Sequence, residues 1–438
     1  MEPFLVPDPP VETLEAWLTV GGGEGLAAAR QLGAAATIDE IDASGLRGRG
    51  GGGFPTGAKW QSVAGGTGTE KYVVANGAEG EPGSFKDRAI MAANPYQVIE
   101  GLAIAAFAIG AREAFLAIKA TFVPQRDALR RALAEMQETG LAGDVPITLV
   151  EGPEDYLFGE EKALLEVIEG RDALPRLLPP YLHGLFATAP QMGWSATDLR
   201  AGHAGRHESN PTLVNNVETL ANVGPILRRG PGWFRTMGTA ASPGSIVATV
   251  VGDVVDPGVV EVEMGTPLDV LIDHGAGGPH PGRQVKAVFS GVANPVIVAA
   301  QLGTRLTYEH MSAIRSGLGS AGFIVFDDTA CMVEVARLMS NFLAVESCGQ
   351  CRPCKAGSTE ITDRLFRIEG GAGTDDDIAT IGSWLRQVTD GARCYLATEE
   401  QELVSSLLRC FPEEFAAHLD DAACPLPRDI PFPPILRQ

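Results

Sequence analysis

The sequence has 438 residues, which is enough for several domains with buried cores, so the chain needs no disulfide scaffold to fold. Its 55 Asp and Glu against 34 Lys and Arg give a formal net charge of −21. This acidic excess argues against nucleic acid and anionic membranes as partners, because both bind through clustered basic residues.

The chain begins with MEPFLVPDPP, in which acidic residues and prolines stand where a secretory signal would have a basic region and an apolar run. The longest apolar stretch, residues 101–111, is too short to span a bilayer and predicts a buried helix. We therefore expect a cytoplasmic protein without direct membrane insertion.

Short β-branched runs alternate with helical patterns between residues 71 and 170. The strand-like runs are KYVVANG, EAFLAIKA and VPITLVEG, and the helical patterns cover residues 94–110, 123–140 and 160–169. This alternation predicts an α/β domain with a largely parallel sheet, to which we assign residues 1–240. The irregular connection at residues 174–211 is longer than a compact domain normally needs, which favours a functional segment.

The pattern of strand-like and helical segments changes in the second half of the chain. Strand-like runs around a helix at residues 267–274 predict a small α+β domain, which we assign to residues 241–330. After that the strand signal disappears. Helical patterns at residues 332–344, 358–368, 376–388 and 399–409 predict a helical bundle over residues 331–438.

A glycine-rich segment, GLRGRGGGGFPTGAKW, occupies residues 45–60. Glycines let backbone N–H groups approach a phosphate, and Arg49 and Lys59 supply counter-charges, so the segment predicts a phosphate or flavin site. A flexible surface loop is the alternative. A Rossmann site is not indicated, because the preceding TIDEIDASGL does not read as a strand, and the Gly-Lys-Ser/Thr ending of a P-loop is missing.

Two further segments carry acidic residues next to predicted elements. YVVANGAEGEP, residues 72–82, ends a strand in small and acidic residues, and YLFGEEKALL places Glu160 and Glu161 at a helix start. The helix dipole alone favours carboxylates there, and hydrogen bonding to a ribose is the functional alternative.

Seven cysteines are unevenly distributed, an odd number that does not indicate a disulfide framework. The spacing of Cys348, Cys351 and Cys354 in CGQCRPC is typical of a loop around a 4Fe-4S cluster, and Cys394 in GARCYLA is the candidate fourth ligand. A zinc site and free core thiols are the alternatives. The other three are interpreted as small buried hydrophobes: Cys331, Cys410 and Cys424.

Taken together, these motifs resemble the NADH-oxidising flavoprotein subunit of respiratory complex I and the matching subunits of NAD-linked hydrogenases and formate dehydrogenases. The resemblance covers nearly the whole chain. It rests on GRGGGGFPTG with a Lys two residues later, EPGSFKDR at residues 81–88, YLFGEE at residues 156–161, VNNVET at residues 214–219 and ESCGQCRPC.

The resemblance implies an FMN-binding α/β domain, a β-grasp domain of the soluble-ligand-binding type and a C-terminal helical bundle that carries a 4Fe-4S cluster. The residues implied to bind FMN are Gly48, Arg49, Gly50, Lys59, Asn76, Glu79, Tyr156, Gly159, Glu160, Asn215 and Asn216. Those implied to contact NADH are Phe54, Glu81, Glu161 and Tyr181. No side chain is expected to act as a catalytic acid or base, because the hydride moves directly to the flavin.

The implied function is an electron-input subunit that oxidises NADH and passes electrons singly through the cluster to a small and a larger iron–sulfur subunit, as in NADH-quinone oxidoreductase. Membrane attachment is expected only through such partners. The acidic residues favour NAD over NADP, since they repel a 2′-phosphate. Two alternatives stay open: a diaphorase subunit of a formate dehydrogenase or hydrogenase, and a subunit that has lost nucleotide chemistry and only wires electrons.

Three positions depart from the family pattern. Ala78 stands where the family has an Asp on the flavin side, Lys162 where it usually has a Thr, and Leu178 where it has a Lys before two prolines. These changes predict weaker binding of FMN or NADH. A histidine pair, His203 and His207, is interpreted as a solvated loop feature instead of a metal site.

Overall fold

A computed structural model describes residues 2–66, 70–188, 208–419, 422–434 and 436. The chain divides into two compact units, one formed by residues up to 80 together with 87–247 and the other by residues 81–86 and 248–438. Within the described part, no helix has the length and apolar character that a bilayer span requires. The boundaries expected at residues 240 and 330 stay predictions.

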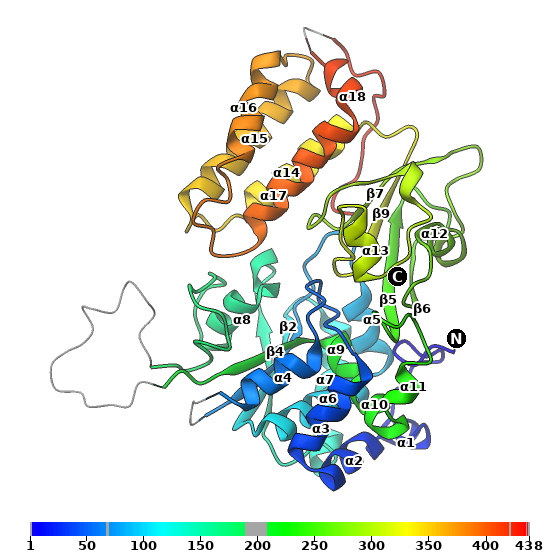
Figure 1. The fold of residues 1–438 in the computed structure, drawn as a ribbon, viewed down its shortest axis with the longest axis vertical. Helices are drawn as coiled ribbons and strands as arrows, with labels where there is room; N and C mark the ends of the chain where they lie inside the picture. The colour runs from blue at the N-terminus through cyan, green and yellow to red at the C-terminus, as the bar shows by residue number, and fades with distance from the viewer. Residues whose placement is uncertain (1, 67–69, 189–207, 420–421, 435, 437–438) are drawn as a thin grey trace, which may run out of the picture. The chain divides into compact units, whose positions relative to one another are not determined.

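The first unit contains a four-stranded sheet in the order β3-β2-β1-β4. Figure 1 labels β2 and β4 of this sheet. Its strands are β1 (Tyr72–Gly77), β2 (Glu113–Lys119), β3 (Ile147–Gly152) and β4 (Thr212–Asn216). Every pairing is parallel, which confirms the predicted α/β class. The strand order reverses at β1, because the chain moves outward through β2 and β3 and then returns to the other side of β1.

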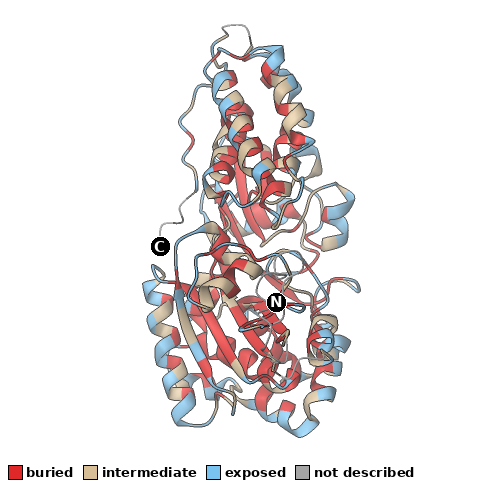
Figure 2. Cartoon of the chain, turned by 90° about the vertical axis from the view of Figure 1, so that its left-hand side faces the viewer, coloured by how far each residue is buried: buried red, intermediate tan, exposed pale blue. Residues whose placement is uncertain are grey.

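Most of the apolar stretch at residues 101–111 lies in α6 (Pro95–Ile109), which confirms the predicted buried helix. Asn94 caps it by accepting the N–H of Gln97 at 3.1 Å, and Gly110 ends it in the left-handed conformation. Nearly every residue of α6 is buried. Most residues of the sheet are buried as well, and Figure 2 shows buried residues in red. A Cβ at Gly101 would lie 1.9 Å from the carbonyl oxygen of Leu220, so this glycine permits the close approach of α6 to the backbone at Leu220.

The remaining helices of the first unit surround this core. They are α1 (Leu14–Thr19), α2 (Glu24–Leu32), α3 (Ala34–Ser44), α4 (Thr56–Ala64), α5 (Lys86–Ala93), α7 (Val123–Glu138), η1 (Tyr156–Gly159), α8 (Glu161–Ile168), α9 (Val217–Ala221), α10 (Val223–Arg229) and α11 (Pro231–Phe234). The segment before the glycine loop is the helix α3 and not a strand, which agrees with the expectation that the loop is not a Rossmann site.

The second unit contains a mixed sheet in the order β6-β5-β9-β7-β8. The strands are β5 (Ser245–Gly252), β6 (Gly258–Glu263), β7 (Val285–Ser290), β8 (Ile297–Val298) and β9 (Gly322–Asp327). β5 runs parallel to β9, whereas β7 is antiparallel to both β9 and β8. The helices here are α12 (Leu268–Ala276), η2 (Ala299–Gln301) and α13 (Tyr308–Ala313), of which only the first was expected.

The C-terminal part of the second unit is helical, as predicted. It comprises α14 (Met332–Glu346), α15 (Arg352–Glu369), α16 (Asp375–Leu385), α17 (Leu396–Cys410) and α18 (Pro412–Ala416). A buried hydrogen-bond network joins three of these helices, because Ser340 Oγ donates to Glu400 Oε1 at 2.6 Å and lies 2.7 Å from Thr362 Oγ1. Burial raises the pKa of Glu400 to about 8.

Candidate functional site

The carboxyl ends of β1 and β4 lie side by side at the point where the strand order reverses. Asn76 is the register partner of Asn216, and Ala75 that of Asn215. In open parallel sheets, ligands bind beyond the carboxyl ends of the strands at such a reversal. The structure thus brings three of the predicted flavin-site residues together at the position where an α/β sheet binds ligands.

The two asparagines of β4 are held by hydrogen bonds on both sides. Asn216 caps α9 through a 3.0 Å bond from the N–H of Glu218, and its Nδ2 donates to Asp87 Oδ2 at 2.8 Å. Asn215 Oδ1 accepts from Trp60 Nε1 at 2.8 Å. Asp87 belongs to the EPGSFKDR string, but no pattern in the sequence singles it out individually.

The glycine loop closes next to this strand end. Gly48 N–H donates to the Phe54 carbonyl at 2.9 Å, and Gly53 takes a positive φ of 59°. A Cβ at Gly50 would lie 3.0 Å from Asn216 Cβ, whereas one at Gly52 would meet open space. The loop therefore packs against β4 on one side and leaves its backbone accessible on the other.

Arg49 anchors the loop to the first unit. Its side chain is buried, its backbone N–H donates to Thr219 Oγ1 at 2.8 Å, and its Nη2 donates to the Pro243 carbonyl at 3.1 Å. These bonds hold the backbone and the side chain of Arg49 in place. The counter-charge role expected for its guanidinium stays a prediction.

The end of β1 is tied to the segment before α8. Asn76 Nδ2 donates to the Gly159 carbonyl at 2.8 Å, and Asn76 Oδ1 accepts from the N–H of Ala78 at 3.1 Å. A Cβ at Gly159 would lie 2.8 Å from the Ala78 carbonyl oxygen, so only glycine permits this approach. Tyr156 belongs to the same short helix, η1, which places it beside the end of β1.

The two glutamates of YLFGEE have different surroundings. Glu160 caps α8, accepting the N–H groups of Lys162 at 2.9 Å and Ala163 at 3.0 Å, so the helix-start interpretation describes its carboxylate. Burial raises the pKa of Glu160. Glu161 instead extends to Lys59 on α4, with Nζ and Oε2 separated by 3.1 Å. Lys162, one of the departures, lies 3.7 Å from Glu160 Oε1.

Glu79 has a structural contact as well. Its carboxylate is buried, accepts the N–H of Asp87 at 3.1 Å and pairs with Arg88 Nε at 2.9 Å. Glu79 therefore holds the start of α5 beside the end of β1.

The predicted NADH contacts do not all lie in one unit. Phe54 and Tyr181 belong to the first unit and are 58% and 49% exposed, so both present aromatic surface to solvent. Glu81 belongs to the second unit, where its Oε1 accepts the N–H of Val292 at 2.6 Å. Leu178, which replaces the basic residue of the family, is half-buried. The histidines His203 and His207 lie outside the described residues.

The cysteine motif lies at the start of α15. Cys351 is the N-cap of this helix, and Cys354 lies in its first turn, where the helix dipole favours negative charge. Cys354 is buried, and Ser347 Oγ lies 3.4 Å from its sulfur, whereas Cys348 is exposed. Burial raises the pKa of the Cys354 thiol, with the neighbouring Cys351 and Cys348 thiols adding to the effect.

The segment before α17 returns to this motif. Arg393 N–H donates to Cys351 Sγ at 3.3 Å, and Arg393 Nη1 donates to Gln350 Oε1 at 3.0 Å. Cys394 follows directly, so a cysteine that lies 40 residues after Cys354 in the numbering reaches the same loop. N–H to sulfur hydrogen bonds are typical of iron–sulfur sites, and this donor set fits a 4Fe-4S cluster.

The prediction for the remaining cysteines needs correction. Cys331 is buried, but Cys410 and Cys424 are only half-buried. Cys331 and Cys424 also approach His418, with the ligand atoms of all three within 4.8 Å of one another. No sequence spacing indicates this group, because tertiary packing alone brings Cys331 to the C-terminal segment.

Comparison with known proteins agrees with this geometry. Residues 41–225 match the family model of the Nuo51 FMN-binding domain, and residues 334–418 match that of the NADH-ubiquinone oxidoreductase-F iron-sulfur binding region. The first match contains the glycine loop and the ends of β1 and β4. The second contains Cys348, Cys351, Cys354 and Cys394.

Full-length relatives point the same way. The chain is 38% identical to the second F-type subunit of NADH-quinone oxidoreductase from Rhizobium meliloti (strain 1021), over 97% of this chain and 99% of that protein. It is 35% identical to the HndC subunit of the NADP-reducing hydrogenase from Solidesulfovibrio fructosivorans, over 94% and 82%. A crystal structure of NAD+-reducing [NiFe]-hydrogenase in the H2-reduced state matches with a TM-score of 0.78 and 30% identity, over 96% of this chain and 68% of that one.

The matches and the geometry agree on the architecture. A parallel α/β FMN-binding domain is followed by a mixed-sheet region and a helical region that binds a 4Fe-4S cluster. The chain therefore belongs to the oxidoreductase family formed by the F-type subunits of NADH-quinone oxidoreductase.

Proposed function

We propose that this chain is the electron-input subunit of a multi-subunit complex, in which it oxidises NADH and passes the electrons singly toward partner iron–sulfur subunits. The observation that carries the proposal is the pairing of Asn76 with Asn216 at the strand-order reversal, next to a glycine loop that packs on Asn216. Bound FMN supplies the conversion from a two-electron hydride to single electrons.

The residues proposed for the flavin site divide into contacts and supports. Gly50, Asn76 and Asn216 lie together at the end of the sheet, and with Lys59 they are proposed to contact FMN. The supports are Arg49, which holds the loop, and Glu79 and Glu160, which hold the starts of α5 and α8. Gly48, Tyr156, Gly159 and Asn215 complete the proposed site.

The nicotinamide nucleotide is proposed to use the exposed aromatic surface of Phe54 and Tyr181 together with the carboxylate of Glu161. Lys59 is proposed to contact FMN and Glu161 to contact the nicotinamide nucleotide. The ion pair between these two side chains would therefore connect the two proposed binding sites. Glu81 is also proposed to contact NADH. Two adjacent carboxylates, Glu160 and Glu161, disfavour a 2′-phosphate, which supports NADH as the donor.

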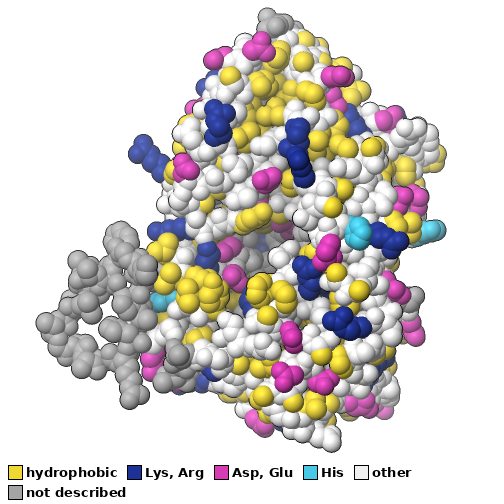
Figure 3. Space-filling view, viewed as in Figure 1, with side chains coloured by type: hydrophobic (Ala, Val, Ile, Leu, Met, Phe, Trp, Pro, Cys, Tyr) yellow, Lys and Arg dark blue, Asp and Glu magenta, His cyan; other side chains and the backbone are white. Residues whose placement is uncertain are grey.

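The second unit is proposed to contain a β-grasp domain of the soluble-ligand-binding type and to hold the cluster through Cys348, Cys351, Cys354 and Cys394. Apolar side chains are exposed beside these thiols. Val345 precedes the motif and is 68% exposed, and Tyr395 follows Cys394 and is 58% exposed. Figure 3 shows further hydrophobic side chains on the helical region. This surface supports docking of a small iron–sulfur subunit beside the cluster.

A diaphorase subunit of an NAD-linked hydrogenase, or of a formate dehydrogenase, is the second candidate. The similarity to HndC and to the NAD+-reducing [NiFe]-hydrogenase favours the hydrogenase over the formate enzyme. Purification of the tagged chain from its native cells distinguishes the two, because the co-purifying subunits belong either to a quinone-reducing complex or to a hydrogenase.

The activity itself is tested on the isolated, FMN-loaded chain. We expect it to reduce ferricyanide with NADH and to have no quinone reductase activity, since the partners that continue the electron path are missing. Flavin-loaded protein that reduces ferricyanide with neither NADH nor NADPH would contradict the proposal. It would favour a subunit that transfers electrons without reacting with a nucleotide.

A further inference from the structure

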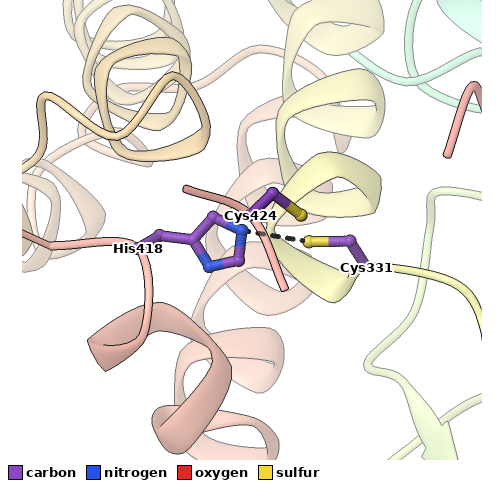
Figure 4. A group of neighbouring side chains, drawn as sticks. All are labelled: Cys331, His418 and Cys424. Carbon is purple, nitrogen blue, oxygen red and sulfur yellow. Dashed lines mark hydrogen bonds between the residues drawn. The ribbon is translucent and has the colours of Figure 1, made fainter. Parts of the chain in front are cut away.

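Three ligand-bearing side chains meet in the second unit, away from the cysteine motif. Cys331 Sγ, His418 Nε2 and Cys424 Sγ all lie within 4.8 Å of one another, with Cys331 Sγ 3.4 Å from His418 Nε2 (Figure 4). Cys331 precedes α14, His418 follows α18, and Cys424 lies in the C-terminal segment. Cys331 and His418 are completely buried.

The orientation of the imidazole is set by its other nitrogen. His418 Nδ1 lies 2.7 Å from the carbonyl oxygen of Glu414, which can only accept, so Nδ1 carries the proton. The lone pair of Nε2 then faces the two sulfurs. A backbone carbonyl that fixes the distal nitrogen in this way is the usual support of a metal-binding histidine.

The surroundings of the group are held in place as well. The Glu414 carboxylate accepts the N–H of Met332 at 3.0 Å and pairs with Lys286 Nζ at 2.7 Å. These bonds fix α18 against the start of α14, so the carbonyl of Glu414 and the thiol of Cys331 have defined positions.

We propose that Cys331, His418 and Cys424 bind one Zn²⁺ ion, with water as the fourth ligand. Two thiolates and a neutral imidazole are a donor set that suits zinc, and tetrahedral geometry needs only one further position. Each thiol loses its proton when the ion binds, so two protons are released and the Zn²⁺ charge is balanced by two thiolates.

This site is separate from the proposed iron–sulfur cluster. The 15 residues of α14 lie between Cys331 and the cysteine motif, which corresponds to about 22 Å at a rise of 1.5 Å per residue. Zinc has no redox chemistry, so the ion would take no part in electron transfer. It joins the start of α14 to the C-terminal segment, which is otherwise held by Arg428 Nη2 to Asp253 Oδ1 at 2.6 Å and by Ile430 N–H to Glu334 Oε1 at 3.0 Å.

The test is the metal content of the full-length protein purified with zinc and iron supplied. We expect about one zinc per chain in the wild type, and a decrease of about tenfold or more in Cys424→Ser and in His418→Ala. The matched control is Cys410→Ser, a half-buried cysteine outside the group, which should keep its zinc. Iron should be unchanged in all three variants, because the motif cysteines are intact.

A measurement on the wild type keeps the test valid if a variant fails to fold. Zinc-edge X-ray absorption should give two sulfur ligands at about 2.3 Å and a nitrogen at about 2.0 Å. Absence of zinc from the wild-type protein, or zinc with only nitrogen and oxygen ligands, would overturn the proposal. So would a Cys331–Cys424 disulfide found by mass spectrometry, or a loss of iron in Cys424→Ser.

Discussion

The backbone N–H of Arg393 donates to the sulfur of Cys351 at 3.3 Å, and this bond brings Cys394 to the loop that holds the other three proposed ligands. The relationship distinguishes Cys394 from Cys410, which lies at the end of α17 and is also half-buried.

Replacement of Cys394 by Ser should therefore remove the cluster. The wild type purified under anaerobic conditions should contain about four iron atoms per chain, and Cys394→Ser should lose most of them, whereas Cys410→Ser should not. Iron and sulfide analysis measures both. Equal iron content in the two variants would show that the fourth ligand lies elsewhere.

Removal of Lys59 should weaken FMN binding. Lys59→Ala deletes a cation that is proposed to contact FMN, and the loss of a charge-assisted hydrogen bond is expected to cost about 1–3 kcal/mol of binding free energy. Arg30→Ala is a suitable control, because Arg30 forms an exposed ion pair with Asp144. Calorimetric or fluorescence titration of the apoprotein with FMN gives both values. An unchanged affinity in Lys59→Ala would remove this residue from the site.

The flavin site also offers a gain-of-function test. Ala78 is buried and donates its N–H to Asn76 Oδ1. The resemblance to the family implies an Asp at this position. Ala78→Asp should strengthen FMN binding if that carboxylate reaches the flavin. A weaker affinity in this variant would show that the buried position cannot accept the charge.

The choice of nucleotide should depend on Glu161. We expect NADH to exceed NADPH by on the order of 100-fold in kcat/KM, because a close contact between like charges costs several kcal/mol. Glu161→Gln should reduce this preference, and Leu178→Lys should lower the KM for NADH by about tenfold by restoring a charged contact. Steady-state ferricyanide reduction checks both variants. Equal activity with the two nucleotides in the wild type would be inconsistent with the proposed contact between Glu161 and the nucleotide.

The free energy of unfolding should decrease as the pH rises, because of Glu400. Burial raises the pKa of this carboxyl from 4.5 to about 8, so the folded protein holds a proton that the unfolded chain releases. The contribution of this proton to the free energy of unfolding is fully present below pH 4.5 and is lost as the pH rises toward 8. The loss is at most about 1.4 kcal/mol for each pH unit. Glu400→Gln should be more stable than the wild type at pH 9, while the exposed control Glu402→Gln should follow the wild type. Denaturant unfolding of both variants across this range provides the comparison.

Patterns along the chain predicted the architecture where a segment carries its own signal. α6 was found from eleven consecutive apolar or small residues, and the strands β1 to β3 from their β-branched runs. β4 was missed as a strand, because its five residues contain two asparagines and read as a binding motif. The segment is both a strand and part of the proposed binding site, since β4 ends at its two asparagines.

Tertiary contacts account for what the sequence could not predict. For Glu160 the sequence left a helix-start role and ligand binding open, and only the hydrogen bonds of the folded chain reveal that its carboxylate caps α8. Cys331 and His418 lie 87 positions apart, and no motif joins them. The individual roles of the flavin and NADH residues stay predictions.

Anaerobic addition of NADH to the FMN-loaded, iron-reconstituted protein is the decisive test of electron entry at this chain. We expect that the flavin absorbance is bleached and that the signal of a reduced 4Fe-4S cluster appears in electron paramagnetic resonance. In Cys394→Ser only the bleaching should remain. A wild-type protein that binds FMN but shows neither change with NADH would contradict the assignment of this chain as the point of electron entry.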